Sequence, residues 1–448
     1  KKSWNAIGQI GAGKNNLSGI IDIAVMQSLA KGDEVKNFVR NYGMVIVDEC
    51  HHVPAFSFEQ ILKNVTGKYV YGLTATPVRQ DGHHPIIFMH CGPVRYKVDA
   101  RQQAEKRPFE HYVIPRFTPF RKPMSQDEKD WTIGEIYSAI STSQIRNKII
   151  IDDVLKSVEE GRNPIVLTER TEHVKLISEA LGKSFPNVIA LTGVMSAKER
   201  RAAFEKLSSI PEESNVVIVS TGRFVGEGFD EPRLDTLFLA MPVAWKGTVQ
   251  QYAGRLHRLY QNKSEVQIYD YVDVHVGVLE RMYHKRLKGY AAIGYTAKAD
   301  SRPFQATNAI FDSHNFLTVF SHDISSAKSE MVIVSPYITK RRLYQMLDIF
   351  SPGINNGAKL AIITRPESDY KEKDRRSFQD MIDDIRDAGA DVIFKTDIHQ
   401  KFAVIDQQIV WYGSINLLSF GNSEESIMRL DSLNIANELL GTIDEMML

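Results

Sequence analysis

Short apolar runs alternate with polar, helix-forming segments along the whole chain. In the first part of the sequence the apolar runs cover residues 20–25, 44–47 and 69–73. Apolar runs of this length, separated by helical or loop segments, are typical of buried strands in a parallel α/β sheet. We therefore predict a first α/β domain over residues 1–120.

The same pattern begins again twice further along. After a helical pattern at 131–160, the predicted strands are 164–167, 188–191, 216–219, 236–240 and 266–271, with a closing helix at 275–288. Past a polar linker at 294–306, the predicted strands are 331–334, 359–364, 391–394, 402–405 and 409–412. With about 150 residues per domain as a guide, we place the second domain at 121–298 and the third at 299–448.

Composition and charge exclude several classes of protein. With 448 residues, 43% of them hydrophobic and 25% charged, the chain has an ordinary globular composition. Its formal net charge is zero, so any nucleic-acid binding must depend on local patches. Two cysteines are too few for a disulfide framework or a cysteine-rich zinc site, which favours a reducing, cytoplasmic compartment. No apolar stretch is long enough to span a membrane and no signal peptide is visible, so we expect no membrane partner.

Candidate chemistry first appears at the end of the second apolar run. Asp48 and Glu49 directly follow residues 44–47, and carboxylates at the carboxyl end of a buried strand face the crevice where α/β sheets bind ligands. Such a pair can hold Mg²⁺ and position a water molecule. Far downstream, Arg255 and Arg258 are three residues apart, a spacing that predicts one helix face and a shared reach to a phosphate.

The motifs around these residues resemble those of superfamily 2 DNA or RNA helicases of the DEAD/DEAH kind. They are Asp48-Glu49-Cys50-His51, then Thr74-Ala75-Thr76-Pro77, then Gln-Tyr-Ala-Gly-Arg-Leu-His-Arg over residues 251–258. Each motif alone would be weak, because an acidic strand end can cap a helix and surface arginines are usually solvated; order and spacing carry the resemblance. The resemblance implies an α/β fold with two RecA-like lobes, the first truncated at its N-terminus.

The resemblance also implies roles for the residues of the nucleotide site. Asp48 would hold Mg²⁺ through water, and Glu49 would orient and deprotonate the attacking water. His51 would relay the nucleotide state to the second lobe through Gln251. Arg255 and Arg258 would neutralise charge on the transferring γ-phosphate.

Further residues would couple this site to the nucleic acid. Thr74 and Thr76 would provide the coupling, and Gln27 and Ser28 would contact the nucleic acid. Residues 77–82 resemble double-stranded-DNA translocases and restriction-enzyme motor subunits more than RNA helicases. DNA, and double-stranded DNA above all, is therefore the expected partner.

A glycine-bearing loop in the second domain is the remaining part of the predicted nucleotide site. Glycine lets the backbone approach a phosphate or a ribose closely, and Gly228 lies in this loop after a β-branched strand. Asp230 could meet either a sugar hydroxyl or a coupling arginine. Both residues are expected to bind the cofactor.

Residues 8–15 have the spacing of a phosphate-binding P-loop except at the last position. A P-loop needs Ser or Thr there to bind Mg²⁺, and this chain has Asn15. We therefore interpret Lys14 as a solvated lysine and expect the true P-loop to lie upstream of Lys1. ATP and Mg²⁺ are then cofactors of the full-length protein, and this chain alone is expected to be inactive as an ATPase.

A second candidate site lies near the C-terminus. His399 and Lys401 are two residues apart on a predicted strand and so face the same way, and Ser414 and Asn416 follow the next strand. The pattern resembles the HKD signature of the phospholipase D superfamily. That resemblance implies that His399 attacks phosphorus to form a phosphohistidine and that Lys401 and Asn416 neutralise the non-bridging oxygens. It also implies that no cofactor is needed.

Two acidic residues also belong to this predicted phosphate site. Asp406 is grouped with the phosphate-binding residues, with a structural or orienting role as the favoured interpretation, and Glu425 would orient a histidine. The superfamily's active site uses two HKD copies, whereas this sequence has one, because His322 and Asp323 lack the following lysine. Either two chains pair as a homodimer to build the site, or the domain only binds the phosphate backbone.

The leading hypothesis is an ATP-dependent DNA helicase or translocase fused to a phospholipase D-like nuclease. A role in restriction, repair or phage defence is inferred from this architecture alone. One alternative is a metal-independent phosphodiesterase for which the helicase part is a scaffold. Another is a non-catalytic nucleic-acid-binding module.

Overall fold

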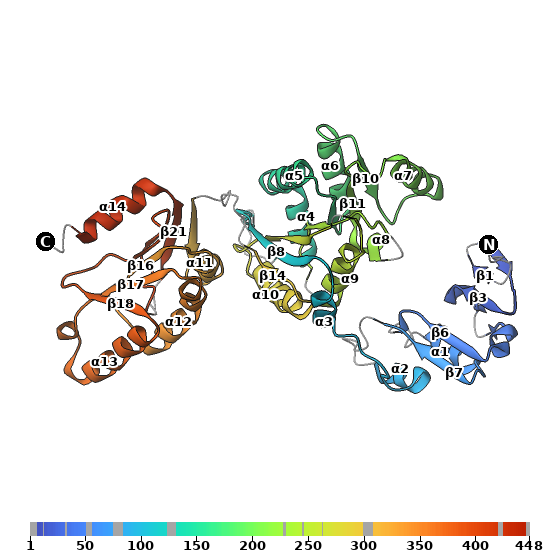
Figure 1. Cartoon of the computed structure of the whole chain (residues 1–448), viewed down its shortest axis with the longest axis horizontal. Coiled ribbons are helices and arrows are strands. Elements are labelled where there is room, and N and C mark those ends of the chain that lie inside the picture. The colour runs from blue at the N-terminus through green and yellow to red at the C-terminus, as the bar shows by residue number, and fades with distance from the viewer. Residues whose placement is uncertain are drawn as a thin grey trace. The chain divides into compact units, whose positions relative to one another are not determined.

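The computed structural model describes residues 7–11, 13–31, 34–50, 56–74, 84–122, 131–226, 230–243, 246–261, 263–298, 308–419 and 424–444. The chain divides into two compact units, Lys1–Gln103 and Ala104–Leu448. The first unit is blue in Figure 1, and the second runs from cyan to red.

The first unit is built from short strands and helices. Its strands are β1 (Ile7–Gly11), β2 (Lys14–Asn16), β3 (Ile21–Ala24), β4 (Ala30–Lys31), β5 (Glu34–Val35), β6 (Met44–Val47) and β7 (Tyr69–Gly72). Its helices are α1 (Phe56–Lys63) and α2 (His84–Cys91), and α3 (Ala100–Glu105) follows at its end. β1 lies between β2 and β3, and β6 pairs in parallel with β7. The three predicted strands correspond to β3, β6 and β7.

The segment with P-loop spacing contains two antiparallel strands, β1 and β2. Residues 8–11 belong to β1, which pairs antiparallel with β2 so that Gly11 lies opposite Lys14 and Ile10 opposite Asn15. A P-loop requires a strand, a loop and then a helix. This segment does not have that geometry, and Lys14 is exposed.

Apolar side chains of the first unit remain at its surface. The exposed fractions are 57% for Ile21, 62% for Ile23 and 60% for Ile46. Strands of parallel sheets are usually covered on both faces. The described residues of this unit therefore leave part of its sheets uncovered.

The second unit begins with a seven-stranded parallel sheet with helices packed on both sides (Figure 1). Its strands are β8 (Glu110–Phe117), β9 (Pro164–Thr168), β10 (Val188–Leu191), β11 (Val217–Thr221), β12 (Thr236–Leu239), β13 (Glu265–Val272) and β14 (Thr296–Ala297). Its helices are α4 (Ile133–Thr142), α5 (Gln144–Glu159), α6 (Thr171–Gly182), α7 (Ala197–Ser209), α8 (Gly222–Gly226), α9 (Lys246–Leu256) and α10 (Gly277–Ala292). The strand order is β10-β11-β9-β12-β13-β8-β14.

Two expectations about this domain are corrected. β8 pairs with β13 over its whole length, so the first domain ends before Ala104 and not at residue 120. The helix expected over residues 131–160 is two helices, because Ser143 is extended and its side chain accepts a hydrogen bond from the backbone of Arg146. Serine favours such an N-cap over a helix interior.

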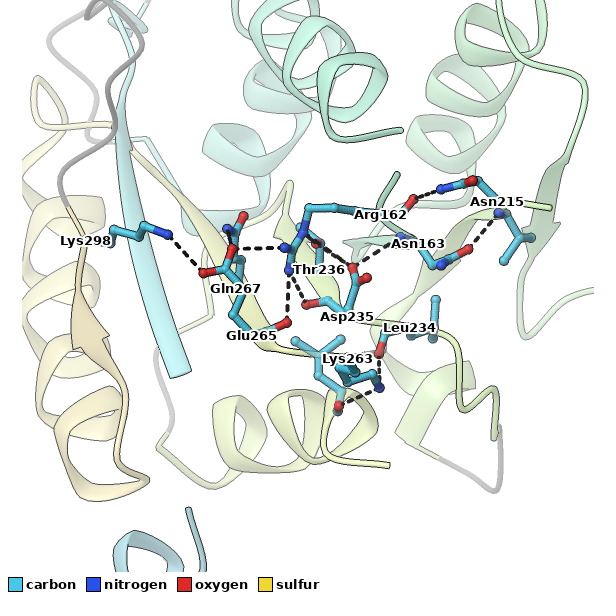
Figure 2. A network of polar contacts seen from close by, with 12 residues as sticks. Arg162, Asn163, Asn215, Leu234, Asp235, Thr236, Lys263, Glu265, Gln267 and Lys298 are labelled. Carbon is cyan, nitrogen blue, oxygen red and sulfur yellow. Dashed lines mark hydrogen bonds and ion pairs between the residues drawn. The ribbon is translucent and has the colours of Figure 1, made fainter. Parts of the chain in front are cut away.

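A polar network closes the amino-terminal edge of this sheet (Figure 2). Arg162 Nη1 lies 3.0 Å from Glu265 Oε1, and Arg162 Nε lies 3.5 Å from Asp235 Oδ1. Lys298, directly after β14, pairs with Glu265 at 3.0 Å. These charges satisfy one another, and ligands of α/β sheets usually bind at the opposite, carboxyl-end edge.

The C-terminal domain is a mixed seven-stranded sheet with helices. Its strands are β15 (Ala309–Asp312), β16 (Glu330–Val334), β17 (Lys359–Thr364), β18 (Ala390–Phe394), β19 (Phe402–Ile405), β20 (Ile409–Gly413) and β21 (Ser426–Asp431). Its helices are α11 (Phe316–Ser325), α12 (Lys340–Asn355), α13 (Glu372–Asp387) and α14 (Leu433–Asp444). The strand order is β15-β21-β20-β19-β16-β17-β18, in which β16, β17 and β18 are parallel. Among the described helices, none is both long and apolar enough to cross a bilayer.

One hydrophobic core runs through both domains of the second unit. Phe117, Val272 and Tyr283 from the parallel-sheet domain belong to the same buried cluster as Phe311 and Phe316 from the C-terminal domain. The hydroxyl of Thr318 on α11 also hydrogen-bonds the carboxylate of Glu280 on α10. The two domains are therefore joined by packing as well as by the chain.

Asp406 stabilises a turn at the carboxyl end of β19, whereas Lys401 lies at the amino end of this strand. Its carboxylate accepts hydrogen bonds from the backbone N–H groups of Lys328, Ser329 and Glu330 at 2.8–3.2 Å. Burial opposes ionisation, but these hydrogen bonds outweigh it and hold the pKa of Asp406 below its usual range. This geometry contradicts the expectation that Asp406 binds phosphate and fits its structural interpretation.

His173 on α6 is a buried, neutral side chain. Its Nδ1 lies 2.8 Å from the hydroxyl of Thr168, and its Nε2 lies 2.9 Å from the amide oxygen of Asn147. Burial, with the nearby charge of Arg146, lowers the pKa of His173 to about 3. The folded chain therefore takes up this proton only at much lower pH than the unfolded chain does.

From this we predict a pH-dependent loss of stability. The unfolded chain protonates His173 near pH 6.5, so its contribution to the free energy of unfolding is present above that pH and is lost as pH falls toward 3. His173→Gln should have a lower free energy of unfolding than the wild type at pH 7. Its free energy of unfolding should also change less with pH, because the difference in protons bound by the unfolded and folded chains falls by up to about one. Urea unfolding at pH 7, 6 and 5 measures this, with His314→Gln, an exposed histidine, as the control. Equal pH slopes for wild type and His173→Gln would contradict the prediction.

A second prediction concerns Asp406. Asp406→Ala leaves three backbone donors without their acceptor and should lower the free energy of unfolding by about 1–3 kcal/mol at neutral pH. Chemical denaturation measures this loss, and binding of tungstate, a phosphate analogue, should be retained in the folded variant. Loss of tungstate binding without loss of stability would contradict this prediction and would indicate that Asp406 binds phosphate.

Candidate nucleotide and phosphate sites

The acidic pair and Thr74 lie at the same edge of the β6–β7 sheet. Asp48 and Glu49 follow β6 at its carboxyl end, and Thr74 follows β7 after one residue. The two strands are parallel, and the backbone N–H of Cys50 donates to the carbonyl of Leu73 at 2.9 Å. The register of two neighbouring strands thus brings together residues about 25 positions apart in the sequence.

Local geometry presents the two carboxylates differently. Asp48 is exposed, and its carboxylate accepts a 2.9 Å hydrogen bond from the backbone N–H of Glu49. Glu49 is half-buried and has a φ of 49°, a left-handed conformation that is uncommon outside glycine. Such backbone outliers cluster at functional sites, although they do not prove one.

The fit of these residues to Mg²⁺ and ATP is partial. Carboxylate oxygens suit Mg²⁺. β1 and β2 are paired antiparallel, so the segment that they form does not supply the phosphate cradle that ATP requires. Gln27 and Ser28 form a short 3-10 helix after β3. His51 and Thr76 lie outside the described residues.

In the parallel-sheet domain, the two arginines do not share a helix face. Gln251 and Arg255 are on α9, but α9 ends at Leu256, so Arg258 lies in the bend beyond it. There its Nε donates to Asp230 Oδ1 at 2.9 Å. Asp230 thus pairs with an arginine, which is one of the two partners that the sequence predicts for it. Gly228 lies outside the described residues.

Lys263 fixes the loop that carries Arg258. Its Nζ donates to the carbonyl oxygens of Leu256, Arg258, Pro232 and Leu234 at 2.8–3.1 Å. Figure 2 shows its contact with Leu234. Burial lowers the pKa of Lys263 to about 8. Basic side chains commonly satisfy the last carbonyls of a helix. The sequence analysis missed this residue, because a lysine shortly after a helix has no distinctive spacing.

Strand register builds the C-terminal site. β19 is antiparallel to β16 with Phe402 opposite Val334, and antiparallel to β20 with Phe402 opposite Tyr412. The segment before β19, the end of β16 and the segment after β20 therefore meet at one edge. His399 is exposed and Lys401 half-buried; both lie on the segment just before β19, which begins at Phe402, and not on the strand itself as expected.

The segment after β20 depends on a glycine. A Cβ at Gly413 would lie 2.3 Å from the carbonyl oxygen of Ser426, so only glycine allows β21 this close. This approach lets the backbone N–H of Ser414 donate to the Ser426 carbonyl at 2.8 Å. The Asn416 amide oxygen is buried and has no hydrogen-bond partner among the described residues. Glu425 directly precedes β21 at the same edge.

His399, Lys401, Ser414 and Asn416 are thus gathered at one edge, whereas Asp406 is at the other. The ammonium of Lys401 donates to the backbone carbonyl of His399 at 3.1 Å, so it lies beside the proposed nucleophile. Arg365, which the sequence analysis did not single out, also contacts His399. The arrangement offers cationic and amide donors around an exposed imidazole, which suits binding of a phosphate oxyanion.

Three protein-family models match different parts of the chain. The model described as "Type III restriction enzyme, res subunit" matches residues 2–79, and the "Helicase conserved C-terminal domain" matches residues 146–260. The model described as "Cardiolipin synthase, PLD-like domain" matches residues 320–447. The three matches cover the regions in which the motifs were recognised.

Known proteins with similar sequences are helicases and translocases. A candidate ATP-dependent RNA helicase of Acanthamoeba polyphaga mimivirus is 24% identical over 263 residues, which are 56% of this chain and 47% of that protein. A DNA 3'-5' translocase of Sulfurisphaera tokodaii is 32% identical over 99 residues, 22% of each protein.

A solved structure with a related fold is a fragment of a candidate HsdR subunit of a type I restriction enzyme from Vibrio vulnificus. It shares 20% identity with a TM-score of 0.48 and covers 66% of this chain and 55% of its own. The chain spans about half the length of the first of these helicase relatives, 47% of it. On its motifs and these three matches, the chain contains superfamily 2 helicase domains followed by a C-terminal phospholipase D-like domain.

Proposed function

We propose that the full-length protein is an ATP-dependent DNA translocase or helicase that carries a phospholipase D-like nuclease. The β16–β19–β20 register brings His399, Lys401 and Asn416 to one edge of the sheet. This observation supports the nuclease part of the proposal. Double-stranded DNA is the favoured substrate, and restriction, repair or phage defence in the cytoplasm is the proposed setting.

The proposed cleavage needs only side chains of this domain. A ring nitrogen of His399 attacks the phosphorus of a phosphodiester, and the bond from phosphorus to the leaving nucleoside oxygen breaks. Lys401 and Asn416 donate to the non-bridging oxygens, whose negative charge increases in the transition state. Water then hydrolyses the phosphohistidine and regenerates the imidazole.

The leaving oxygen needs a proton, and this chain has one HKD copy. We propose that His399 of a second chain supplies it, so that the active form is a homodimer. His399 is exposed, as a side chain shared between two copies of the domain must be before they pair. A dimeric site also makes the specific activity rise with protein concentration.

For the motor half, the proposal is supported by two groupings. Asp48, Glu49 and Thr74 share one edge in the first unit, and Asp230 pairs with Arg258 in the second. These groups have the chemistry to hold Mg²⁺ and to respond to a γ-phosphate. The helicase relatives support translocation on nucleic acid, and the DNA translocase among them favours DNA.

A non-catalytic role is the second candidate function. A single HKD copy that does not pair with another would bind the phosphate backbone without cleaving it. In that case the C-terminal domain would hold DNA while the motor part acts on it. Salt-dependent DNA binding without turnover is its signature.

We predict metal-independent cleavage. In EDTA and without ATP, the chain should cut labelled single- or double-stranded DNA, and His399→Ala should reduce the rate by about 10³-fold or more. His314→Ala, the same change at an exposed histidine of the same domain, should cleave as the wild type does. Gel analysis of the products measures this.

DNA binding without cleavage by either chain would favour the holding role. Cleavage that survives His399→Ala would overturn the assignment of the nucleophile. Analytical ultracentrifugation of the same samples tests whether the active species is a dimer.

We also predict that this chain does not hydrolyse ATP. β1 and β2 pair as antiparallel strands, so the segment with P-loop spacing does not supply an amide cradle for the β- and γ-phosphates. Phosphate release with saturating DNA and Mg²⁺ should therefore equal that of Asp48→Asn. DNA-stimulated release that Asp48→Asn abolishes would contradict the prediction and would place a working phosphate cradle within the 448 residues.

A further inference from the structure

Arg365 is a cationic side chain that touches the proposed nucleophile. It directly follows β17, which lies beside β16 in the sheet, so it emerges at the edge where His399 and Lys401 lie. Its Nη2 atom is 3.1 Å from Nε2 and 3.4 Å from Nδ1 of His399. Nη2 is nearly equidistant from the two ring nitrogens of His399, so the guanidinium lies against the imidazole ring and contacts both nitrogens.

Two other contacts fix the position of this guanidinium. Arg365 Nε donates to the carbonyl oxygen of Ile398 at 3.0 Å, and Nη1 donates to the Tyr337 hydroxyl at 3.1 Å. The guanidinium carbon also lies 5.0 Å from the centre of the Tyr337 ring. The Arg365 side chain is only 13% exposed, so these contacts hold it in one place. Preorganised donors of this kind stabilise developing charge at little cost in reorganisation.

The charge of Arg365 is weakly compensated. Within the described part of the chain, the carboxylate paired with Arg365 is that of Asp369, four residues later, whose Oδ2 lies 4.0 Å from Nη1. Contacts to a carbonyl, a hydroxyl and an imidazole leave the positive charge in place. With Lys401 beside the same histidine, the edge carries two cations next to the nucleophile.

We propose that Arg365 is a further catalytic residue of this site, which binds a non-bridging oxygen of the phosphodiester that His399 attacks. The inference rests on the proposed function and extends it, because it assigns a phosphate-binding group that lies outside the HKD signature. A planar guanidinium presents two N–H donors to a phosphate, which a lysine ammonium does not reproduce. Arg365 thus fixes the orientation of the phosphate, and Lys401 supplies a second positive charge.

The competing explanation is purely structural. Arg365 could serve only to tie the segment before β19 to β17 through the Ile398 carbonyl. In that case its loss would lower stability or displace His399 but would not change phosphate affinity in a folded variant. The two explanations therefore differ in a binding measurement that does not require cleavage.

The test uses the full chain and tungstate, an inert phosphate analogue, titrated by calorimetry. Arg365→Gln keeps a polar side chain of similar length and removes the charge, and Arg365→Lys keeps the charge and loses the planar fork. The control is Arg386→Gln, at a half-exposed arginine of α13 in the same domain. Thermal unfolding of each variant shows that it is folded.

We expect tungstate to bind about 10-fold more weakly to Arg365→Gln, with partial recovery in Arg365→Lys and no change in the control. In the cleavage assay, Arg365→Gln should lower kcat about 100-fold with a smaller effect on KM. Equal tungstate affinity in wild type and folded Arg365→Gln would overturn the inference.

The outcomes separate this inference from the proposed function. If the wild type binds tungstate through Arg365 but cuts no DNA, Arg365 remains a phosphate ligand and the nuclease proposal fails. If the wild type cleaves and Arg365→Gln cleaves equally well, the nuclease proposal stands and the role of Arg365 fails. If tungstate does not bind to the wild type, the role of Arg365 as a phosphate ligand fails, and DNA cleavage alone decides the nuclease proposal.

Discussion

Parallel pairing of strands is the constraint on which the functional parts of this protein depend. Parallel strands place all their carboxyl ends at one edge, and helices cover the faces of the sheet, so ligand-binding side chains gather at that edge. In the first unit this edge gathers Asp48, Glu49 and Thr74. In the C-terminal domain, β16 and β17 bring Arg365 to the edge where the antiparallel β19 presents His399. Residues from distant segments thus converge without direct links in the sequence.

The other contacts hold this framework in place. The Arg162 network closes the amino-terminal edge of the parallel sheet, and Lys263 fixes the loop that carries Arg258. In the C-terminal domain, Asp323 is buried and accepts from Arg429 at 2.7 Å and from Trp411 at 2.8 Å. Buried charges are tolerated because each is paired and hydrogen-bonded, and removing one partner would leave the other uncompensated. Stability and site geometry therefore depend on the same paired residues.

The continuous core between the parallel-sheet domain and the C-terminal domain has a consequence for function. Phe117 and Tyr283 pack in the same cluster as Phe311, so separating the two domains would expose apolar surface. In the proposed translocase, a motion of the parallel-sheet domain would then carry the proposed phosphodiesterase site with it. The first unit differs, because apolar side chains such as Ile23 and Ile46 stay exposed on its small sheets.

The sequence by itself determined the α/β fold, most strands of the last two domains and the two groups of chemical motifs, because apolar periodicity and motif spacing are local properties. The predictions from the sequence were wrong where the position of a strand or a side chain depends on pairing between distant segments. β8 belongs to the second sheet because it pairs with β13 about 150 residues later, and Asp406 faces a turn because β16 begins beside it. Lys263 and Arg365 have no distinctive neighbours in the sequence. Only the tertiary structure shows their roles, because hydrogen bonds to carbonyls and to an imidazole depend on positions in space.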